Sequence, residues 1–233
     1  MSYMDINNAS RIGVCGGVIV SQHHVLTAAH CFNIKPNLQN VTLMVGSHVN
    51  IAEKIDKDTK LKSLKNCTIH PSYIKGRPGN DLAILKIEGS FNLNEEPWLD
   101  KICLPQPETM IEKLGPNCYT LGWGLYDDNA TISNILRETC MRPIEKAGCL
   151  REKDLSMREV RMIKTENVFC GISNHYYSAG YCGPGDSGGP LVCSDNGIFT
   201  LHGIISKGIS NMSICILTDV KMRFDWLNQT INN

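Results

Sequence analysis

The hydrophobic positions of this chain fall into short runs that are broken by polar and glycine-rich segments. One run, residues 25–29, combines β-branched and apolar side chains with small ones and ends at His30 and Cys31. This pattern predicts a buried strand that closes in a tight turn, with His30 held at its rim. A second run follows Asp81 over residues 82–87 and predicts an alternating apolar strand with the aspartate at its head.

A third pattern, near the C-terminus, has the period of a helix. Val220, Phe224, Leu227 and Ile231 recur on one helical face, so a helix is predicted to start near Val220. The composition favours many short strands elsewhere, because the 233 residues include 20 glycines, 10 prolines and only 6% aromatic residues. A chain of this length is ample for a large core, and all-β folds of this size often form one unit.

Charge and hydropathy exclude several classes of partner. The formal net charge is zero, so nothing favours binding to nucleic acid or to an acidic membrane surface. No apolar run approaches the roughly 20 residues of a membrane span. The sequence therefore predicts neither a nucleic-acid partner nor a membrane partner.

The most informative stretch is Gly185-Asp186-Ser187-Gly188-Gly189-Pro190. Its glycines allow a sharp turn and leave N–H groups free to face a developing oxyanion. A serine hydroxyl is a weak nucleophile without a base and an orienting carboxylate. His30 and Asp81 are candidates for these two roles, because a carboxylate beside an imidazole fixes its tautomer and stabilises the imidazolium that forms.

Two other interpretations of Ser187 fit less well. The pattern Gly185-x-Ser187-x-Gly189 also matches the nucleophile elbow of α/β-hydrolases, whose order is serine, acid, histidine. Only residues 188–233 follow the serine, and their sole histidine is His202, which leaves too little chain for that fold. In the second interpretation the glycine-rich stretch is only a structural loop. The patterns around His30 and Asp81 would then be coincidences.

With these motifs the chain resembles the chymotrypsin-like (trypsin-like) serine protease family. Segments in the family's order span essentially its whole length: residues 15–21, Gly122-Trp123-Gly124, Phe169-Cys170-Gly171, residues 191–193 and residues 224–227. The resemblance implies an all-β fold of two packed six-stranded antiparallel β-barrels with a C-terminal helix. It implies one serine protease domain over residues 1–233, with the first barrel in 1–105, the second in 106–219 and the helix in 220–233.

The same resemblance implies a serine endopeptidase that cleaves peptide bonds through an acyl-enzyme. His30 would act as general base, Asp81 would orient it, and Ser187 would attack. The N–H groups of Gly185 and Ser187 would form the oxyanion hole. The reaction needs no cofactor or metal, and the acidic residues in 53–58 alternate with lysines, so we interpret them as solvated surface. Protein or peptide substrates are the implied partners, together with protein inhibitors.

The specificity pocket departs from that of tryptic members, which carry an aspartate at its base. Either Gly180 or Tyr181 takes this position, depending on where an insertion before Gly185 is placed, and neither is acidic. We therefore expect an apolar or small side chain, rather than Lys or Arg, before the scissile bond. The insertion also abuts Gly185 and could displace its N–H group.

Ser206, Lys207 and Gly208 resemble the strand that pairs with the substrate backbone. The family usually has an aromatic residue at the position of Lys207. A lysine there either favours acidic neighbours in the substrate or is simply solvated, and we favour the second interpretation.

Active members of the family begin with a cleaved Ile/Val-Val-Gly-Gly-like terminus. Its α-ammonium pairs with the aspartate before the nucleophile, here Asp186. Only residues 1–14 precede Cys15, and neither this terminus nor an export signal is among them. We therefore expect an N-terminally truncated first barrel, an uncompensated buried charge at Asp186, and poor hydrolysis by this chain alone. The alternative function is a non-catalytic protease homologue that acts as a binding module.

The 11 cysteines indicate an oxidising compartment. Spacing alone does not fix their pairing, but the resemblance implies four bridges: Cys15–Cys31, Cys118–Cys193, Cys149–Cys170 and Cys182–Cys215. Cys103 matches the cysteine through which many relatives tether a propeptide or an upstream chain. Alternatively, it is a buried free thiol or pairs with Cys67 or Cys140.

Asparagine sequons point to the secretory pathway. Asn-x-Ser/Thr begins at Asn8, Asn40, Asn66, Asn129, Asn211 and Asn228. We expect a secreted glycoprotein that is made as a zymogen and resides outside the cell or in a secretory granule.

Overall fold

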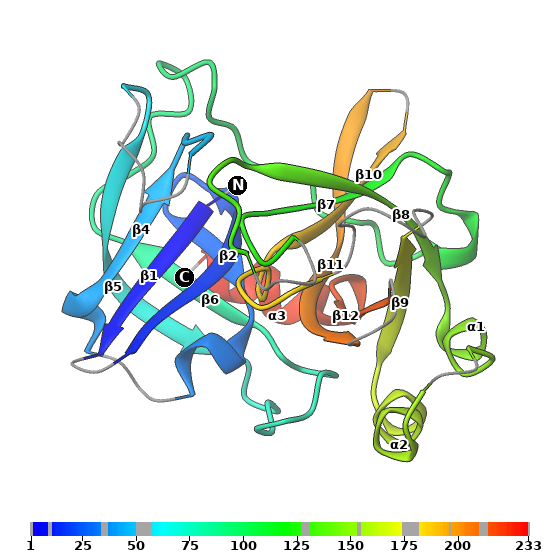
Figure 1. Cartoon of the computed structure of the whole chain (residues 1–233). Coiled ribbons are helices and arrows are strands. Elements are labelled where there is room, and N and C mark those ends of the chain that lie inside the picture. The colour runs from blue at the N-terminus through cyan, green and yellow to red at the C-terminus, as the bar shows by residue number, and fades with distance from the viewer. Residues whose placement is uncertain are drawn as a thin grey trace.

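Two closed six-stranded antiparallel β-barrels lie side by side in the computed structural model (Figure 1). This confirms the predicted fold class. The structure describes residues 2–8, 11–33, 37–49, 57–126, 131–152, 155–173, 182–195, 197–209 and 214–232, with the backbone alone at 2–8, 11–13 and 195. No helix in these ranges is long and apolar enough to cross a membrane.

The first barrel contains strands β1 to β6 in the ring order β1-β2-β3-β6-β5-β4, and it closes where β4 pairs with β1. The strands are β1 (Ser2–Asn8), β2 (Arg11–Ser21), β3 (His24–Thr27), β4 (Val41–Val45), β5 (Lys60–Ile69) and β6 (Ala83–Ile87). Two 3-10 turns, η1 (Ala29–Phe32) and η2 (Leu38–Asn40), connect β3 to β4.

The second barrel has the ring order β10-β11-β12-β9-β8-β7. Its strands are β7 (Cys118–Gly122), β8 (Arg137–Ile144), β9 (Val168–Ser173), β10 (Pro190–Asp195), β11 (Ile198–Ile209) and β12 (Ile214–Asp219). The 3-10 turn η3 (Ile111–Lys113) precedes β7. Helices α1 (Lys146–Cys149) and α2 (Met157–Thr165) project from this barrel between β8 and β9 (Figure 1).

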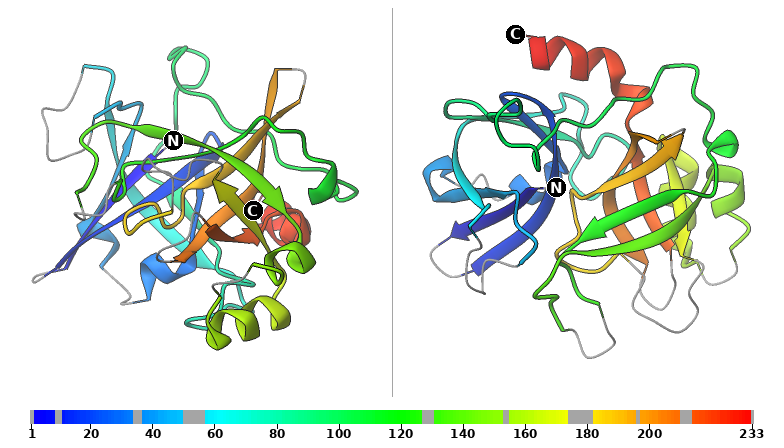
Figure 2. Two further views of the ribbon diagram at one scale, coloured as in Figure 1. Left: turned by 45° about the vertical axis from the view of Figure 1, so that its right-hand side comes forward. Right: turned by 90° about the horizontal axis from the view of Figure 1, so that it is seen from above.

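The C-terminal helix begins slightly later than the sequence pattern predicts. The 3-10 turn η4 (Lys221–Arg223) follows β12, and α3 (Phe224–Asn232) continues from it along the outside of the barrels (Figure 2). Val220 and Leu227 are fully buried, which agrees with the predicted apolar face. The helix therefore anchors the end of the chain on the barrels through that face.

Strands β3 and β6 are buried on both faces, which explains their almost continuous apolar sequences. Side chains alternate along a strand, so Val25 and Leu85 pack in the core of the first barrel. Leu26 and Ile84 pack on the opposite face, in the layer between the two barrels. Every residue of β6 except Lys86 is buried. Burial on two sides thus replaces the alternation predicted for this run.

The layer between the barrels is one continuous apolar cluster. Burying a large aliphatic side chain contributes about 1.5–3 kcal/mol, so this layer holds the two barrels in a fixed relation. That relation positions the candidate residues of the first barrel against those of the second. The buried members of the layer are Val18, Val20, Leu26, Ala28, Leu82, Ile84, Val192, Leu201, Ile204, Val220 and Leu227.

Candidate active site

The pairing of β3 with β6 brings His30 and Asp81 together. The two strands are antiparallel, with Thr27 opposite Ala83. The residues just after β3 and just before β6 therefore emerge at the same end of the pair. His30 lies in η1 after the extended residue Ala28, and 29% of its side chain is exposed. This is the position at the strand rim that the sequence predicts.

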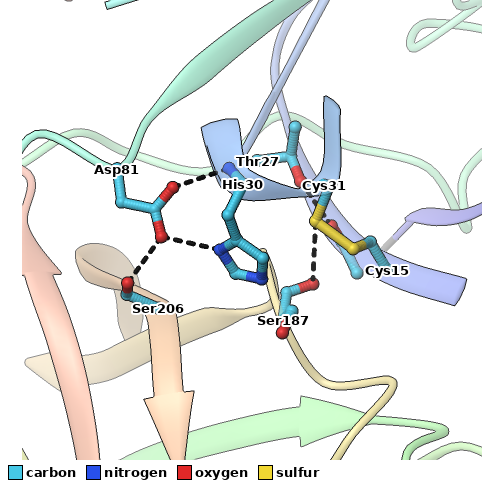
Figure 3. The surroundings of a disulfide bond; sticks show 8 residues. Cys15, Thr27, His30, Cys31, Asp81, Ser187 and Ser206 are labelled. Atoms are coloured by element: carbon cyan, nitrogen blue, oxygen red, sulfur yellow. Dashed lines mark hydrogen bonds and ion pairs between the residues drawn. A yellow bond between two sulfur atoms is a disulfide. The ribbon is translucent and has the colours of Figure 1, made fainter. Parts of the chain in front are cut away.

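Asp81 is buried beneath the histidine, with only 2% of the residue exposed. Its Oδ1 accepts a hydrogen bond from the backbone N–H of His30 at 2.8 Å, and its Oδ2 accepts one from His30 Nδ1 at 2.7 Å. The hydroxyl of Ser206 donates to the same Oδ2 at 2.5 Å (Figure 3). These three donors compensate a carboxylate that would be costly to bury unpaired. Two of them also set the orientation of the imidazole.

Ser187 lies in a tight turn before β10, and the imidazole lies between it and Asp81 (Figure 3). The carbonyl oxygen of Ser187 accepts a hydrogen bond from the N–H of Gly16 at 2.7 Å. The next residue, Gly188, has φ +80° and no room for a side chain. The turn is therefore docked closely against the first barrel. The structure thus brings together three predicted residues from both barrels.

The N–H groups of Gly185 and Ser187 differ from their neighbours in this turn. In the described ranges neither makes a hydrogen bond, whereas the N–H groups of Asp186, Gly188 and Gly189 all donate to backbone carbonyls. Free N–H groups beside a nucleophile can hold a developing oxyanion. The Ser187 hydroxyl also has no hydrogen-bond partner within the part of the chain that the structure describes.

The side chain of Asp186, the residue before Ser187, is partly buried beside a cavity. Its Oδ1 accepts a hydrogen bond from the N–H of Gly124 at 2.9 Å, and its Oδ2 accepts one from the N–H of Gly183 at 3.0 Å. The cavity is also lined by Leu125 and Cys182. Among the residues with described side chains, no Lys, Arg or His forms an ion pair with this carboxylate.

Asp186 should lower the stability of the chain as the pH rises. Burial raises the pKa of this carboxyl from 3.8 to about 6, although the hydrogen bonds from Gly124 and Gly183 oppose the rise. The folded state then binds the proton more tightly than the unfolded state. The contribution of this group to stability is therefore fully present below about pH 4 and is lost as the pH rises through about 6. We expect a loss of about 2 kcal/mol, allowing for its partial exposure.

The matched variant is Asp186→Asn, which keeps the shape of the side chain but removes the ionisable carboxyl group. Free energies of unfolding from urea titrations at pH 4 and pH 7 give the change with pH for each protein. The wild type should lose about 2 kcal/mol more than the variant over this interval. Equal changes in the two proteins would show that Asp186 does not cause this dependence of stability on pH.

The predicted substrate-binding residues are only partly described. Gly180 and Tyr181 lie outside the described residues. Ser206, Lys207 and Gly208 lie on β11, one edge of which pairs with β12 at residues 207 and 208. Gly208 also lies directly against Cys182, because a Cβ at Gly208 would coincide with the carbonyl oxygen of Cys182. The two segments expected to form the pocket walls are therefore in contact at Cys182 and Gly208.

Lys207 has a partner that sequence reasoning missed. Its Nζ lies 3.2 Å from Oε1 of Glu159 on α2, and 39% of the lysine side chain is exposed. Burial raises the pKa of Glu159, but hydrogen bonds from Ser156 and the charge of Lys207 outweigh it, so the net pKa is lowered. The lysine is thus paired within the chain, rather than simply solvated.

The structure contains four disulfides, and they join the pairs that the resemblance implied: Cys15–Cys31, Cys118–Cys193, Cys149–Cys170 and Cys182–Cys215. Cys67, Cys103 and Cys140 are unbonded, and Cys103 is exposed. Cys103 is therefore neither a buried thiol nor paired with one of the other two cysteines in this structure. Its carbonyl accepts a hydrogen bond from Leu201 of the second barrel at 2.9 Å.

One group of potential metal ligands lies beside the site. Atoms of Cys15, His30 and Cys31 lie within 4.8 Å of one another. The two sulfurs are bonded to each other, so neither is a thiolate that could bind a metal ion. With the disulfide intact, this cluster offers the histidine alone.

A histidine–aspartate pair on one β-barrel, facing a glycine-flanked serine on a second barrel, is the arrangement of serine proteases built from two barrels. Residues 4–227 match the protein family described as Trypsin, and the chain therefore belongs to this family of serine proteases.

Two relatives illustrate the similarity. The chain is 32% identical over 205 residues to coagulation factor XI of Bos taurus, an alignment that spans 88% of this chain and 31% of the relative. It is 29% identical over 224 residues to chymotrypsin-C of Mus musculus, spanning 93% of this chain and 78% of the relative. The chain thus spans about a third of the first relative and most of the second.

Proposed function

We propose that this chain is a serine endopeptidase that cleaves peptide bonds through an acyl-enzyme. The observation that carries the proposal is the buried carboxylate of Asp81, which holds His30 through two hydrogen bonds beside Ser187. Labelling of Ser187 by a fluorophosphonate tests it, because such probes react with an activated serine hydroxyl. A purely structural role for the three residues predicts no adduct.

Each proposed step follows from the contacts at the site. Ser187 Oγ attacks the carbonyl carbon of the scissile bond, while Nε2 of His30 accepts the hydroxyl proton. Asp81 stabilises the resulting imidazolium, because its Oδ2 accepts the Nδ1–H. The N–H groups of Gly185 and Ser187 donate to the developing oxyanion. His30 then returns the proton to the leaving amine, which leaves an ester on Ser187. Water attacks this ester in the same way, with His30 as the base, and Ser187 is released.

We further propose that Asp186 is the switch for this site and accepts an α-ammonium group in the adjoining cavity. Two backbone N–H groups hold the carboxylate, but no described cation pairs with it. Filling the cavity with an ammonium group would compensate that charge. It would also act on Cys182, which lines the cavity and whose carbonyl oxygen lies against Gly208.

The chain alone should therefore react slowly, and the dipeptide Ile-Val should accelerate labelling of Ser187 by about 10- to 100-fold, a typical coupling between two sites. The matched control is N-acetyl-Ile-Val, which lacks the ammonium group and should have no effect. The variant Asp186→Asn should also be unresponsive. Rapid turnover without the dipeptide, abolished by Ser187→Ala, would contradict this part of the proposal.

The expected specificity is for an apolar or small side chain before the scissile bond. Neither Gly180 nor Tyr181 offers a carboxylate to a basic side chain. Ratios of kcat/KM for peptides with Leu, Ala or Arg at this position test the preference, and faster cleavage after Arg would overturn it.

Secretion, glycosylation and a tethered partner also belong to the proposal. The side chains of Asn40, Asn66 and Asn228, which begin sequons, are exposed, as is the unbonded Cys103. Four disulfides are typical of an oxidising compartment. Mass analysis of the chain secreted from eukaryotic cells, before and after glycan removal, would detect these modifications. A protein of unmodified mass would contradict them.

The second candidate is a non-catalytic homologue that binds partners. The contact between Cys182 and Gly208 and the unbonded hydroxyl of Ser187 favour it. Absence of labelling both with and without Ile-Val would support this function over the enzyme.

A further inference from the structure

The four residues immediately before Asp81 are each tied to the second barrel or to the C-terminal segment. Arg77 forms an ion pair with Glu166 at 3.5 Å, and the hydroxyl of Thr218 on β12 donates to the carbonyl of Pro78 at 2.6 Å. These two links join the first barrel to segments more than 80 residues away in sequence.

The strongest links come from Arg223 in η4. Its Nε donates to Oδ1 of Asn80 at 2.5 Å, and its Nη2 donates to the carbonyl of Gly79. Its Nη1 donates to the carbonyl of Met222 at 3.0 Å. The residue is only 8% exposed, so the guanidinium has little water to replace these acceptors.

Two carboxylates partly offset the burial of the Arg223 guanidinium. Burial lowers the pKa of Arg223, and the charges of Asp219 and Glu166 oppose this lowering without cancelling it. Glu166 also lies directly against Gly79, where a Cβ would coincide with its Oε2. Asn80 is held from its other side as well, because its Nδ2 donates to the carbonyl of Ser72 at 3.2 Å. The segment 77–80 is thus fixed along its whole length.

We infer that Arg223 is a positioning residue for the active site, acting through residues 79 and 80 to set the place of Asp81 relative to Ser187. Asp81 belongs to the first barrel and Ser187 to the second, so their alignment depends on contacts that cross between the barrels. Arg223, in the turn that follows β12 of the second barrel, makes two contacts with the first barrel directly beside the aspartate. The expected effect of Arg223 on the labelling rate rests on the proposed function, whereas its effect on the position of Asp81 does not.

The test uses Arg223→Met, with Lys221→Met as the matched control. Lys221 lies in the same turn, but its Nζ donates to the carbonyl of Thr109 and does not touch residues 77–80. We expect Arg223→Met to slow fluorophosphonate labelling of Ser187 by roughly 10- to 100-fold, the loss typical of a small misplacement in an active site. Arg223→Lys should recover part of the rate, because lysine reaches one acceptor at a time. Lys221→Met should label at the wild-type rate.

A second readout needs no activity. The backbone N–H of His30 is bonded to Asp81, so its hydrogen exchange reports the position of the carboxylate. Arg223→Met should speed this exchange by about tenfold, and Lys221→Met should leave it unchanged. The NMR signal of the His30 Nδ1 proton should shift in the first variant alone. Where Arg223→Met fails to fold, Asn80→Ala removes the same contact from the other side.

The outcomes separate the two proposals. A folded Arg223→Met protein with wild-type exchange at His30 would overturn the positioning role, whatever its labelling rate. If wild-type Ser187 takes no label while exchange at His30 still changes in the variant, the positioning role stands and the proposed enzyme fails. Changes in both readouts support both proposals.

Discussion

Asp81→Asn should slow the reaction of Ser187 with a fluorophosphonate by about 10⁴-fold, the loss typical of a Ser–His–Asp triad whose aspartate becomes its amide. The carboxylate accepts a hydrogen bond from His30 Nδ1 at 2.7 Å. An asparagine can present its NH₂ group to the same nitrogen and then stabilises the tautomer with the proton on Nε2. An imidazole in that tautomer cannot take the proton from the serine.

The measurement is the second-order rate constant of labelling, in the presence of Ile-Val for every variant. Asp100→Asn is the matched control, because Asp100 is exposed and its Oδ1 accepts a hydrogen bond from the neighbouring N–H of Lys101 rather than from a residue of the site. It should label at the wild-type rate. Circular dichroism must show that both variants are folded. A loss below about tenfold in a folded Asp81→Asn protein would mean that His30 does not depend on this carboxylate.

Gly188→Ala should lower the free energy of unfolding by about 4 kcal/mol. The residue has φ +80°, which costs a non-glycine residue about 1–2 kcal/mol. A Cβ would also overlap the carbonyl oxygen of Gly16 and the hydroxyl of Thr27, and it would lie tightly against the backbone nitrogen of Ala28. Two of these three atoms belong to the backbone and cannot rotate away, so overpacking adds about 1–3 kcal/mol.

Gly76→Ala separates the two causes. Gly76 has nearly the same φ, +82°, but nothing lies within 4 Å of the position of its Cβ. This variant should lose only about 1–2 kcal/mol in urea unfolding. Equal losses in the two variants would show that the contact between the turn at Ser187 and the first barrel is loose.

Much of the site could be predicted because its signals are local. The apolar run before His30 and the run after Asp81 describe strands whose ends carry these residues. The glycines around Ser187 describe the turn. The resemblance to a family supplied what local patterns lack, namely the pairing of the cysteines and the joining of two barrels.

The contacts that could not be predicted join residues far apart in sequence. The ion pair between Lys207 and Glu159 depends on where α2 packs, and neither residue has a neighbour that indicates the other. The hydrogen bonds from Arg223 to residues 79 and 80 span more than 140 positions. The contact between Gly208 and the carbonyl oxygen of Cys182 depends on backbone placement, which no side-chain pattern encodes.

The start of the C-terminal helix illustrates a smaller discrepancy. The apolar period includes Val220, but η4 and its tighter 3-10 geometry separate this residue from α3. A 3-10 turn at a helix start retains nearly the same side-chain period, so the pattern does not distinguish it.

The whole proposed mechanism depends on Ser187 being a nucleophile that His30 activates. The most direct test is the intact mass of the protein after incubation with a fluorophosphonate in the presence of Ile-Val, followed by peptide mapping. We expect a single adduct on Ser187, none in Ser187→Ala or His30→Ala, and slow formation in Asp81→Asn. No adduct on the folded wild type, or an adduct that forms equally well without His30, would contradict it.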